Sequence, residues 1–461
     1  MLNLRLSFPR RGKVPEGRKG DVEDGLGSRC DIPLPSALRA ATFPLRGKGV
    51  ILALLVALFC TTASAQQERN PPPGARIRID AASLPAPFAS PSVANPADRV
   101  RRPADAQLSV PPGFTARLWA DNIGRARTIA FAANGDALIA DSSAGRIGVL
   151  RDADRDGRAE VRTVLVDGFN RPFGLAIRPD GLYVADTEAV WRLDYVPGDL
   201  KARGRPVRVT SQGALGPGAG HWTRSLAFHP DGERFYVGIG SRGNIGEEPS
   251  PRATIQEFRR DGSGQATFAS GLRNPIGIAF YPGTPRLYAA VNERDGLGDE
   301  LVPDYLTRVE RDSFHGWPYA YTGGWPQPGL GEKRRDLVAR SAMPQLLIRS
   351  HSAPIHLAFY DGTLFPERYR GGAFMALQGS WNADRPRGYF LAFAPFVKDA
   401  RTGIEKPAGD YEVFASGFWV SGSGRATIWG MPAGVAVAPD GALFLTDDVG
   451  GTIWRIAPTG R

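Results

Sequence analysis

The sequence predicts an all-β fold, a six-bladed β-propeller whose blades are four-stranded antiparallel sheets. The first observation is a short pattern of two apolar strands joined by a tight turn, which occurs six times. A repeat of about 40–50 residues built from short strands is typical of propellers, with one copy per blade. The second is composition. The 461 residues include 56 Gly and 39 Pro, which suits a large all-β domain with many turns.

Each copy of the pattern reads as a hairpin with Pro-Asp-Gly or a similar turn between its strands. The copies span residues 128–141, 174–186, 225–240, 277–291, 356–377 and 434–447, the fifth being the loosest. Their central alanines are Ala130, Ala176, Ala227, Ala279, Ala358 and Ala436. These markers are 46, 51, 52, 79 and 78 residues apart, which predicts insertions after the fourth and fifth copies. We expect these insertions to shape the substrate pocket.

Residues 1–65 are predicted to be a leader. A basic flank at 46–48 precedes an apolar run at 50–60, and Ala63-Ser64-Ala65 follows, the pattern of a secretory signal cleaved after Ala65. The run is too short to span a bilayer comfortably, so we expect no transmembrane segment in the mature chain. Residues 1–45 are either an unusually long leader or the result of a start placed too early, and we favour the second. The protein is expected to be periplasmic or secreted.

Removal of the leader changes what the composition implies. Both cysteines, Cys30 and Cys60, leave with it, so no disulfide is expected in the mature chain. The leader carries 10 Lys/Arg and 5 Asp/Glu, and its loss lowers the formal net charge from +10 to +5. Since no basic run with interleaved aromatic residues remains, we do not expect nucleic-acid binding.

Residues 66–109 are rich in proline and lack a periodic apolar pattern. This composition predicts a linker or an extended strap on the domain surface. The β-domain is expected to span 110–461 and to begin with a strand at 115–120.

The hairpin repeat predicts where polar side chains gather. Because the turns all lie at one end of the blades, the residues that flank each hairpin meet at the opposite mouth of the channel. Residues before the hairpins include Arg125, Arg127, Asn170, Arg171, His221, Arg224, Arg273, Asn274, His351 and Trp429. Residues after them include Asp141, Asp186, Ser241, Arg242, 292–295, Trp381, Asn382, Asp447 and Asp448. Clustered arginines suit a planar, multiply anionic ligand and the acids suit a cation, or else both form ion pairs that cap the channel.

Four motifs lie at these same positions. They read GHWTR at 220–224 with YVGIGSRGN at 236–244, RNPIG at 273–277, NERDGLGDELV at 292–302 with FHGWP at 314–318, and QGSWN at 378–382. In these motifs the chain resembles the glucose/sorbosone dehydrogenase family, its sorbosone-type branch most of all, from about residue 110 to the C-terminus. The resemblance implies a soluble or periplasmic six-bladed propeller that uses pyrroloquinoline quinone (PQQ) and calcium.

The resemblance also implies roles for the matching residues. His221 would be the general base that removes the hydroxyl proton of the substrate while hydride passes to the quinone. Arg273 and Asn274 would bind the quinone oxygens and stabilise their developing charge. Arg242 and Arg385 would lie near the carboxylates of the cofactor.

For the metal, the resemblance implies that the backbone carbonyls of Arg294 and Asp295 bind calcium, which acts as a Lewis acid. Asp299 and Glu300 would shape or ligate this segment. The family often has Gly-Pro where Arg294 and Asp295 stand here, so the Asp295 carboxylate is a further candidate ligand.

Two other positions depart from the family pattern. Gly220 precedes His221, where the family can have an Asp that orients the imidazole. Met431 replaces an arginine of a W-G-R-P loop that pairs with the cofactor, unless Arg425 takes its place.

A second cation site is predicted at residues 152–160. Its candidate ligands are Asp152, Asp154, Asp156, the carbonyl of Arg158, and Glu160. The alternating carboxylates around Gly157 suit calcium, but position 12 is Thr163 instead of a bidentate Glu. The segment is either a loop stapled by structural calcium, which we favour, or a solvated acidic turn.

The remaining histidines divide into two groups. His229, His315 and His356 are expected to be structural, whereas His351 either contacts substrate or is structural.

Three classes of function follow. The leading one is a PQQ- and calcium-dependent oxidoreductase of a sugar or sugar-derived aldehyde. Since the chain lacks a C-x-x-C-H haem motif, a separate quinone or cytochrome would accept the electrons. The alternatives are a calcium-dependent, lactonase-like hydrolase and a propeller binding protein that has lost the cofactor. The excess of arginine argues against the hydrolase. Gly220 and Met431 are compatible with a binding protein that has lost the cofactor.

Overall fold

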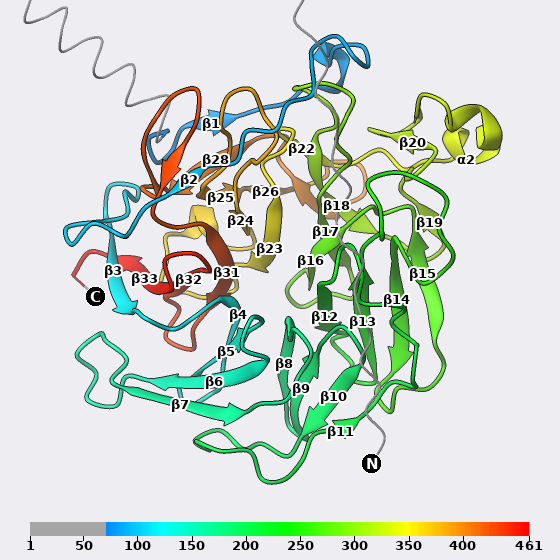
Figure 1. Cartoon of the computed structure of the whole chain (residues 1–461). Helices are drawn as coiled ribbons and strands as arrows, with labels where there is room; N and C mark the ends of the chain where they lie inside the picture. The colour runs from blue at the N-terminus through cyan, green and yellow to red at the C-terminus, as the bar shows by residue number, and fades with distance from the viewer. Residues whose placement is uncertain (1–70, 461) are drawn as a thin grey trace, which may run out of the picture. The chain divides into compact units, whose positions relative to one another are not determined.

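The computed structural model describes residues 71–460, so the predicted signal sequence lies outside the described residues. Within them the predicted all-β class and the four-stranded antiparallel sheets are confirmed. Six sheets of four or five strands fan out around a common centre (Figure 1). Each sheet is named here by its innermost strand.

The first three sheets follow the chain from the centre outward. The β4 sheet contains β4 (Ala126–Phe131), β5 (Ala137–Asp141), β6 (Arg146–Arg151) and β7 (Val161–Val166). The β8 sheet contains β8 (Gly174–Arg178), β9 (Gly181–Ala185), β10 (Val190–Leu193) and β11 (Val207–Arg208). The β12 sheet contains β12 (Arg224–Phe228), β13 (Arg234–Ile239), β14 (Thr254–Arg259), β15 (Ala266–Ser270) and, parallel to β15, β19 (Ser313–Phe314).

The other three sheets include strands from distant parts of the chain. The β16 sheet contains β16 (Pro275–Phe280), β17 (Leu287–Val291), β18 (Asp304–Val309) and β22 (Leu346–Ile348). The β23 sheet contains β23 (Pro354–Phe359), β24 (Ala373–Leu377), β25 (Phe390–Ala394), β28 (Tyr411–Ala415) and β1 (Arg76–Ile77). The β31 sheet contains β31 (Pro432–Val437), β32 (Leu443–Asp447), β33 (Thr452–Pro458) and β3 (Phe114–Ala120).

All six predicted hairpins form, each from the two innermost strands of a sheet. The turn between β4 and β5 illustrates the chemistry. Gly135 has φ +91°, a left-handed conformation that glycine adopts without steric cost, and its N–H donates to the carbonyl of Ala132 at 2.9 Å.

The innermost strands contact one another in a closed order. β4, β8, β12, β16, β23 and β31 are neighbours in sequence order, and β31 contacts β4. Glycines permit the close approach: a Cβ at Gly174 would lie within 3 Å of Leu226, and one at Gly277 would lie 2.9 Å from the amide nitrogen of Leu357. The recurrent Gly at the start of the repeat thus serves packing between sheets.

The β31 sheet joins the two ends of the described domain. Its outermost strand β3 is the first strand of the domain, and it pairs antiparallel with the last strand, β33, from Phe114↔Pro458 to Ala120↔Ile453. The hairpin repeat does not predict this pairing, because it records only neighbours along the chain.

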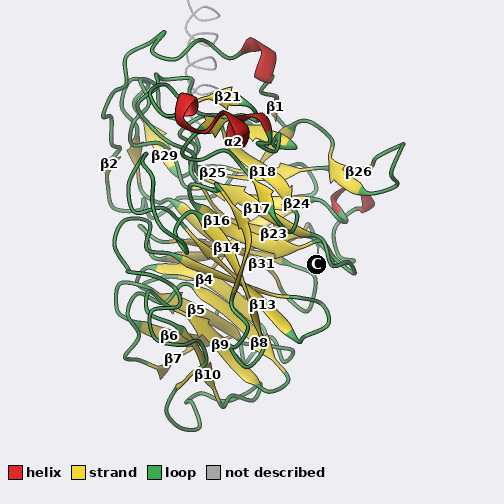
Figure 2. Ribbon diagram, turned by 90° about the vertical axis from the view of Figure 1, so that its right-hand side faces the viewer, coloured by secondary structure: helices red, strands yellow, loops and turns green. Residues whose placement is uncertain are grey.

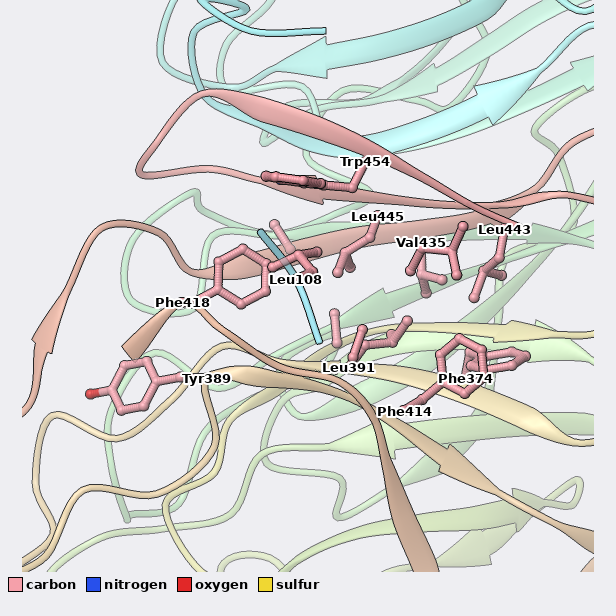
Figure 3. Close-up of a cluster of buried hydrophobic side chains, with 14 of the residues drawn as sticks. Leu108, Phe374, Tyr389, Leu391, Phe414, Phe418, Val435, Leu443, Leu445 and Trp454 are labelled. Carbon is pink, nitrogen blue, oxygen red and sulfur yellow. The ribbon is translucent and has the colours of Figure 1, made fainter. Parts of the chain in front are cut away.

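Apolar side chains fill the space between neighbouring sheets. Figure 3 shows the cluster between the β23 and β31 sheets, where Phe374 and Phe414 face Val435, Leu443 and other buried residues. The Phe374 and Phe414 rings meet edge-on with centroids 4.7 Å apart. Such interdigitated packing fixes the angle between sheets and hence the positions of the strand ends.

Residues 71–109, here called the strap, run in an extended course and bond to several sheets. β1 pairs with β28, and β2 (Asp98–Arg99) pairs parallel with β30 (Thr427–Ile428), which in turn pairs with β29 (Trp419–Ser421). The side-chain amide of Asn95 donates to the carbonyls of Ala383, Asp384 and Gly424.

The long steps of the repeat contain additional small elements. After β18 come β20 (Ala320–Tyr321), β21 (Trp325–Pro326), the 3-10 turn η2 (Gly331–Arg334) and α2 (Arg335–Ala339). After β24 comes the hairpin of β26 (Phe396–Lys398) and β27 (Glu405–Pro407). Two more 3-10 turns are η1 (Ala81–Ser83) and η3 (Glu367–Tyr369). Helices are short throughout residues 71–460 (Figure 2), and none there has the length and apolar character needed to cross a bilayer.

Candidate active site

A cavity of about 470 Å³ opens where the residues flanking the hairpins converge. The predicted site residues that line it are His221, Arg273, Asn274 and Asp295. Others from the predicted mouth are Arg125, Arg127, Asn292, Glu293, His351, Trp381, Asn382 and Asp448. Further lining residues include Arg99, Trp222, Asp304, Gln378 and Met431.

His221 precedes β12 and has its ring fixed by one backbone carbonyl. Its Nδ1 lies 2.8 Å from the carbonyl oxygen of Ser241. Because a carbonyl only accepts, Nδ1 carries the proton and the lone pair of the neutral ring is on Nε2. Ser241 Oγ, 3.0 Å from Nδ1, donates its own proton to the carbonyl of Gly243 and is therefore also an acceptor.

The imidazole of His221 is neutral at physiological pH. Burial, followed by the positive charge of Arg273, lowers its pKa from 6.5 to about 4. Nε2 makes no hydrogen bond with another residue of 71–460. The ring thus presents an unprotonated nitrogen on the cavity wall.

Gly220 allows the chain to approach Ser241 closely. It has φ +70°, and a Cβ there would collide with the backbone of Arg242. An Asp at this position would therefore clash. Here the Ser241 carbonyl orients the imidazole, at a position where an Asp before the histidine can do so in the family that the motifs resemble.

Arg273 is buried and held on three sides. Its Nε and Nη2 donate to the carbonyl and side-chain oxygen of Asn244 at 3.1 and 2.9 Å, and its Nη1 donates to the carbonyl of Glu293 at 2.6 Å. A longer contact of 3.4 Å joins Nη2 to Asp295. These bonds occupy four of the five guanidinium N–H groups, so one remains for an oxygen in the cavity.

Three buried oxygen atoms on the cavity wall lack a hydrogen-bond partner among the described residues. They are Asn274 Oδ1, Asn292 Oδ1 and Glu293 Oε1. A buried acceptor without a partner costs free energy, so these three atoms favour a bound cation or hydrogen-bond donor at this wall.

Asp295 and His351 lie within ion-pair distance of each other beside Arg273. Their Oδ1 and Nδ1 atoms are 3.4 Å apart, and the side-chain amide of Asn382 donates to the same Oδ1 at 2.7 Å. Burial opposes the charge on both groups. The contact with His351 nevertheless holds the pKa of Asp295 below its ordinary value, and the contact with Asp295 raises that of His351. His351 therefore contributes to the cavity, whereas His229, His315 and His356 do not line it.

Asp304 is a buried cavity residue that the motifs do not mark. Its two carboxyl oxygens accept the backbone N–H groups of Glu293 and Ala353 at 2.8 and 2.9 Å. Burial outweighs these bonds and raises its pKa to about 7. Asp304 follows the cis-bonded Leu301-Val302 segment without a recognisable pattern, so the sequence offers no signal for it.

The other residues of the predicted metal segment lie outside the cavity lining. The buried Arg294 guanidinium pairs with Glu293 and donates to Gln327 and to the carbonyl of Ala320. Asp299 and Glu300 both pair with Arg387. The carbonyl of Asp295 accepts from Asn244 at 2.7 Å and keeps a second lone pair.

Three predicted cofactor ligands also lie elsewhere. Arg242 is exposed and does not line the cavity. Arg385 lines a separate cavity of about 420 Å³ together with Arg349 and Arg387. Arg425 donates to the carbonyl of Pro96 in the strap at 2.8 Å, whereas Met431 lines the main cavity.

Two tryptophans line the cavity. The guanidinium groups of Arg127 and Arg171 lie over the Trp222 ring, 5.5 and 5.1 Å from its centroid. Trp381 is 56% exposed at the cavity, so it offers a flat apolar face to a ligand.

The acidic loop at 152–160 brings three carboxylates together. Ligand oxygens of Asp152, Asp154 and Asp156 lie within 4.8 Å of one another. Glu160 accepts the N–H of Ala153 at 2.7 Å, and Asp156 accepts the N–H of Arg158 at 2.8 Å. Asp152 and Asp156 border a cavity that shares no residue with the one around His221, so any ion there would lie outside the cavity of His221.

Comparisons with known proteins identify the family of this chain. The model of the TrAA12-like family matches residues 108–308 and 331–459. A pyrroloquinoline quinone-dependent pyranose dehydrogenase of Coprinopsis cinerea is 24% identical over 411 residues. The match covers 76% of this chain but only 54% of that enzyme, so the chain spans about half of its length.

Solved structures show the same fold. The holo form of the PQQ domain of the Coprinopsis cinerea pyranose dehydrogenase superposes with a TM-score of 0.65 at 20% identity, covering 78% of this chain and all of that chain. The calcium structure of a Trichoderma reesei carbohydrate-active enzyme of family AA12 gives 0.63 at 17% identity, covering 78% and 99%. The resemblance to PQQ-dependent sugar dehydrogenases found in the motifs is thus confirmed, and the chain belongs to the TrAA12-like family.

Proposed function

We propose that the protein is a PQQ- and calcium-dependent oxidoreductase that oxidises a sugar or sugar-derived aldehyde. We further propose that its six larger sheets are the six blades of a β-propeller around the active site. The observation that carries the proposal is the state of His221, a buried neutral imidazole whose Nδ1 is fixed on Ser241 while Nε2 borders the cavity. The relative named as a PQQ-dependent pyranose dehydrogenase supports the same reaction class.

The cavity residues fit the implied groups. PQQ is a planar quinone with three carboxylates, and Arg99, Arg125 and Arg127 border the cavity that would hold it. The unpaired oxygens of Asn274, Asn292 and Glu293 are hard ligands of the kind that calcium prefers. Asp295, including its carbonyl, would complete the oxygen set.

When bound, PQQ would supply the two-electron acceptor for the substrate hydride, and calcium would polarise it. The residues of the chain would transfer the proton and stabilise the developing charge. His221 Nε2 would take the proton of the substrate hydroxyl, because Nδ1 is already protonated and the ring is neutral. Arg273, fixed by Asn244 and Glu293, would direct its remaining N–H at an oxygen on which negative charge develops.

Substrate binding is proposed for the exposed face of the site. A pyranose ring presents apolar C–H groups that can pack on an indole, and Trp381 offers such a face at the cavity. The electrons would leave to a separate quinone or cytochrome.

Reconstitution tests the proposal. Purified protein is loaded with PQQ and CaCl₂, and dye reduction is followed with a panel of aldoses and aldehydes. We expect turnover that requires PQQ and is lost on chelation of calcium. PQQ-independent hydrolysis of lactones would instead favour the hydrolase, and PQQ binding without dye reduction by any substrate would contradict the oxidoreductase.

Export is part of the proposal. We propose that the mature chain begins after Ala65 and acts in the periplasm or outside the cell. N-terminal sequencing of the protein recovered from the periplasmic and secreted fractions tests it, and an intact residue 1–65 segment in that material would contradict it.

A further inference from the structure

One cavity residue comes from outside the matched family region. Arg99 lies on β2 of the strap, whereas the family model begins at residue 108. Among residues 71–109 of the described chain, Arg99 alone lines the cavity around His221. The strap is therefore part of the wall of the site, although it lies outside the residues that the family model matches.

The backbone at Arg99 is held from both sides. The N–H of Asp98 donates to the carbonyl of Ala426 at 2.8 Å, and the N–H of Val100 donates to the carbonyl of Ile428 at 2.9 Å. Arg425 adds a bond to the carbonyl of Pro96. Because these are main-chain bonds or bonds from neighbours, replacing the Arg99 side chain leaves the course of the strap intact.

The charges of the cavity are unevenly paired. Each lining carboxylate has at least one partner: Glu293 Oε2 has Arg294, Asp295 has Arg273 and His351, Asp448 has Arg127, and Asp304 has two backbone N–H groups. Within residues 71–460 the guanidinium groups of Arg99 and Arg125 form no hydrogen bond or ion pair. Two cations thus remain at the rim without an anion.

We infer that Arg99 and Arg125 form a carboxylate-binding pair at the rim of the cavity, through which the strap takes part in ligand binding. Guanidinium groups bind carboxylates in a bidentate manner, and two of them favour a ligand with at least one carboxylate. The inference rests on the proposed function. The carboxylate belongs either to PQQ or to an acidic sugar, and the two sources are separable by experiment.

The test compares Arg99→Ala and Arg125→Ala with Arg101→Ala. Arg101 is an exposed strap arginine outside the cavity, so its replacement removes the same charge without removing a proposed contact. PQQ affinity is measured by isothermal titration in the presence of CaCl₂, and KM is measured for glucose against glucuronate and for galactose against galacturonate. A third titration uses benzene-1,3,5-tricarboxylate, a planar tricarboxylate that cannot be reduced by a sugar.

If the carboxylate belongs to PQQ, each variant binds PQQ and benzenetricarboxylate about tenfold more weakly than the wild type. This is the loss expected for one charged hydrogen-bonded contact. Added salt then weakens anion binding by the wild type more than anion binding by the variants. If it belongs to the substrate, KM rises about tenfold for the two uronates alone. Arg101→Ala changes none of these values.

Variants that match the wild type and Arg101→Ala in every measurement overturn the inference, even where the wild type oxidises sugars. A wild type that binds benzenetricarboxylate through Arg99 and Arg125 but does not bind PQQ keeps the inference and contradicts the proposed function. A wild type that binds neither anion and shows no uronate preference contradicts both.

Discussion

At the scale of residues, a backbone carbonyl sets the chemistry of His221. Ser241 fixes the tautomer, burial keeps the ring neutral, and Gly220 gives the chain room to bring the two together. The motif G-H-W-T-R marks the histidine, but its orienting partner is found only in the folded chain, since Ser241 lies on the segment after β13.

Replacement of His221 tests the role of the base. His221→Ala is expected to lower kcat by about 10²–10⁴-fold, the usual contribution of general base catalysis, and to leave PQQ affinity within about twofold. Steady-state dye reduction and PQQ titration of the same preparations measure the two effects. Loss of PQQ binding with unchanged turnover per bound PQQ would assign His221 to the cofactor instead.

The pKa of His221 also predicts a pH dependence. The folded value of about 4 lies below the unfolded value of 6.5, so between these pH values the unfolded chain binds more protons and stability falls as pH falls. Urea unfolding of wild type and His221→Ala at pH 7 and pH 5 measures this. The wild type should lose more stability on acidification than the variant, and equal losses would mean that the imidazole is not buried in its neutral form.

Gly220 offers a test of backbone strain near the site. Gly220→Ala is expected to cost more than the roughly 1–2 kcal/mol of a left-handed alanine, because its Cβ also meets the Arg242 backbone. Gly135→Ala is the matched control, since it has a positive φ but no atom within 4 Å. Denaturant midpoints compare the two, and a Gly220→Ala cost no larger than that of Gly135→Ala would argue against the close contact with Arg242.

At the scale of elements, local signals were sufficient for the hairpins and insufficient for the strap. The turn chemistry and apolar alternation of each hairpin lie within about 20 residues, so all six were predictable. The contacts of the strap join residues some 300 positions apart, such as Asn95 and Gly424. No spacing in the sequence records them, which is why the sequence predicts neither Arg99 at the cavity nor the bond from Arg425 to the strap.

Asn95 is expected to brace the loops beside the cavity. Asn95→Ala removes three hydrogen bonds, to Ala383, Asp384 and Gly424, and should speed amide exchange at 381–385 and 422–426. Ser83→Ala is the control, because its hydroxyl bonds only to the carbonyl of Asp80 within its own turn. Hydrogen exchange followed by mass spectrometry measures both. Unchanged exchange in the two loops would show that the strap does not hold them.

At the scale of the whole molecule, closure of the ring decides where the site forms. β3 joins β33, β31 joins β4, and the ends of the innermost strands then surround the cavity. The sequence predicted the convergence of His221, Arg273, Asn274 and Asp295, because the repeat fixes their positions relative to each hairpin. It did not predict Asp304, which begins β18 and is held by the backbone N–H groups of Glu293 and Ala353, segments far apart in the sequence.

A ligand that bridges several sheets should stabilise the whole domain. At a PQQ concentration of 100 times its Kd, with calcium present, the free energy of unfolding is expected to rise by about 2.7 kcal/mol. Thermal and denaturant unfolding with and without PQQ measure the change. Tight PQQ binding without any such stabilisation would indicate that the unfolded chain or a surface site binds it.

The most direct measurement of the central claim is the absorbance spectrum of the PQQ- and calcium-loaded protein, recorded without oxygen or dye during addition of an aldose. The account predicts that the bound quinone is reduced within the time of one catalytic turnover. In His221→Ala loaded to the same extent, the reduction is expected to be much slower. A spectrum that stays unchanged across the panel of sugars and aldehydes, or a reduction equally fast in His221→Ala, would contradict it.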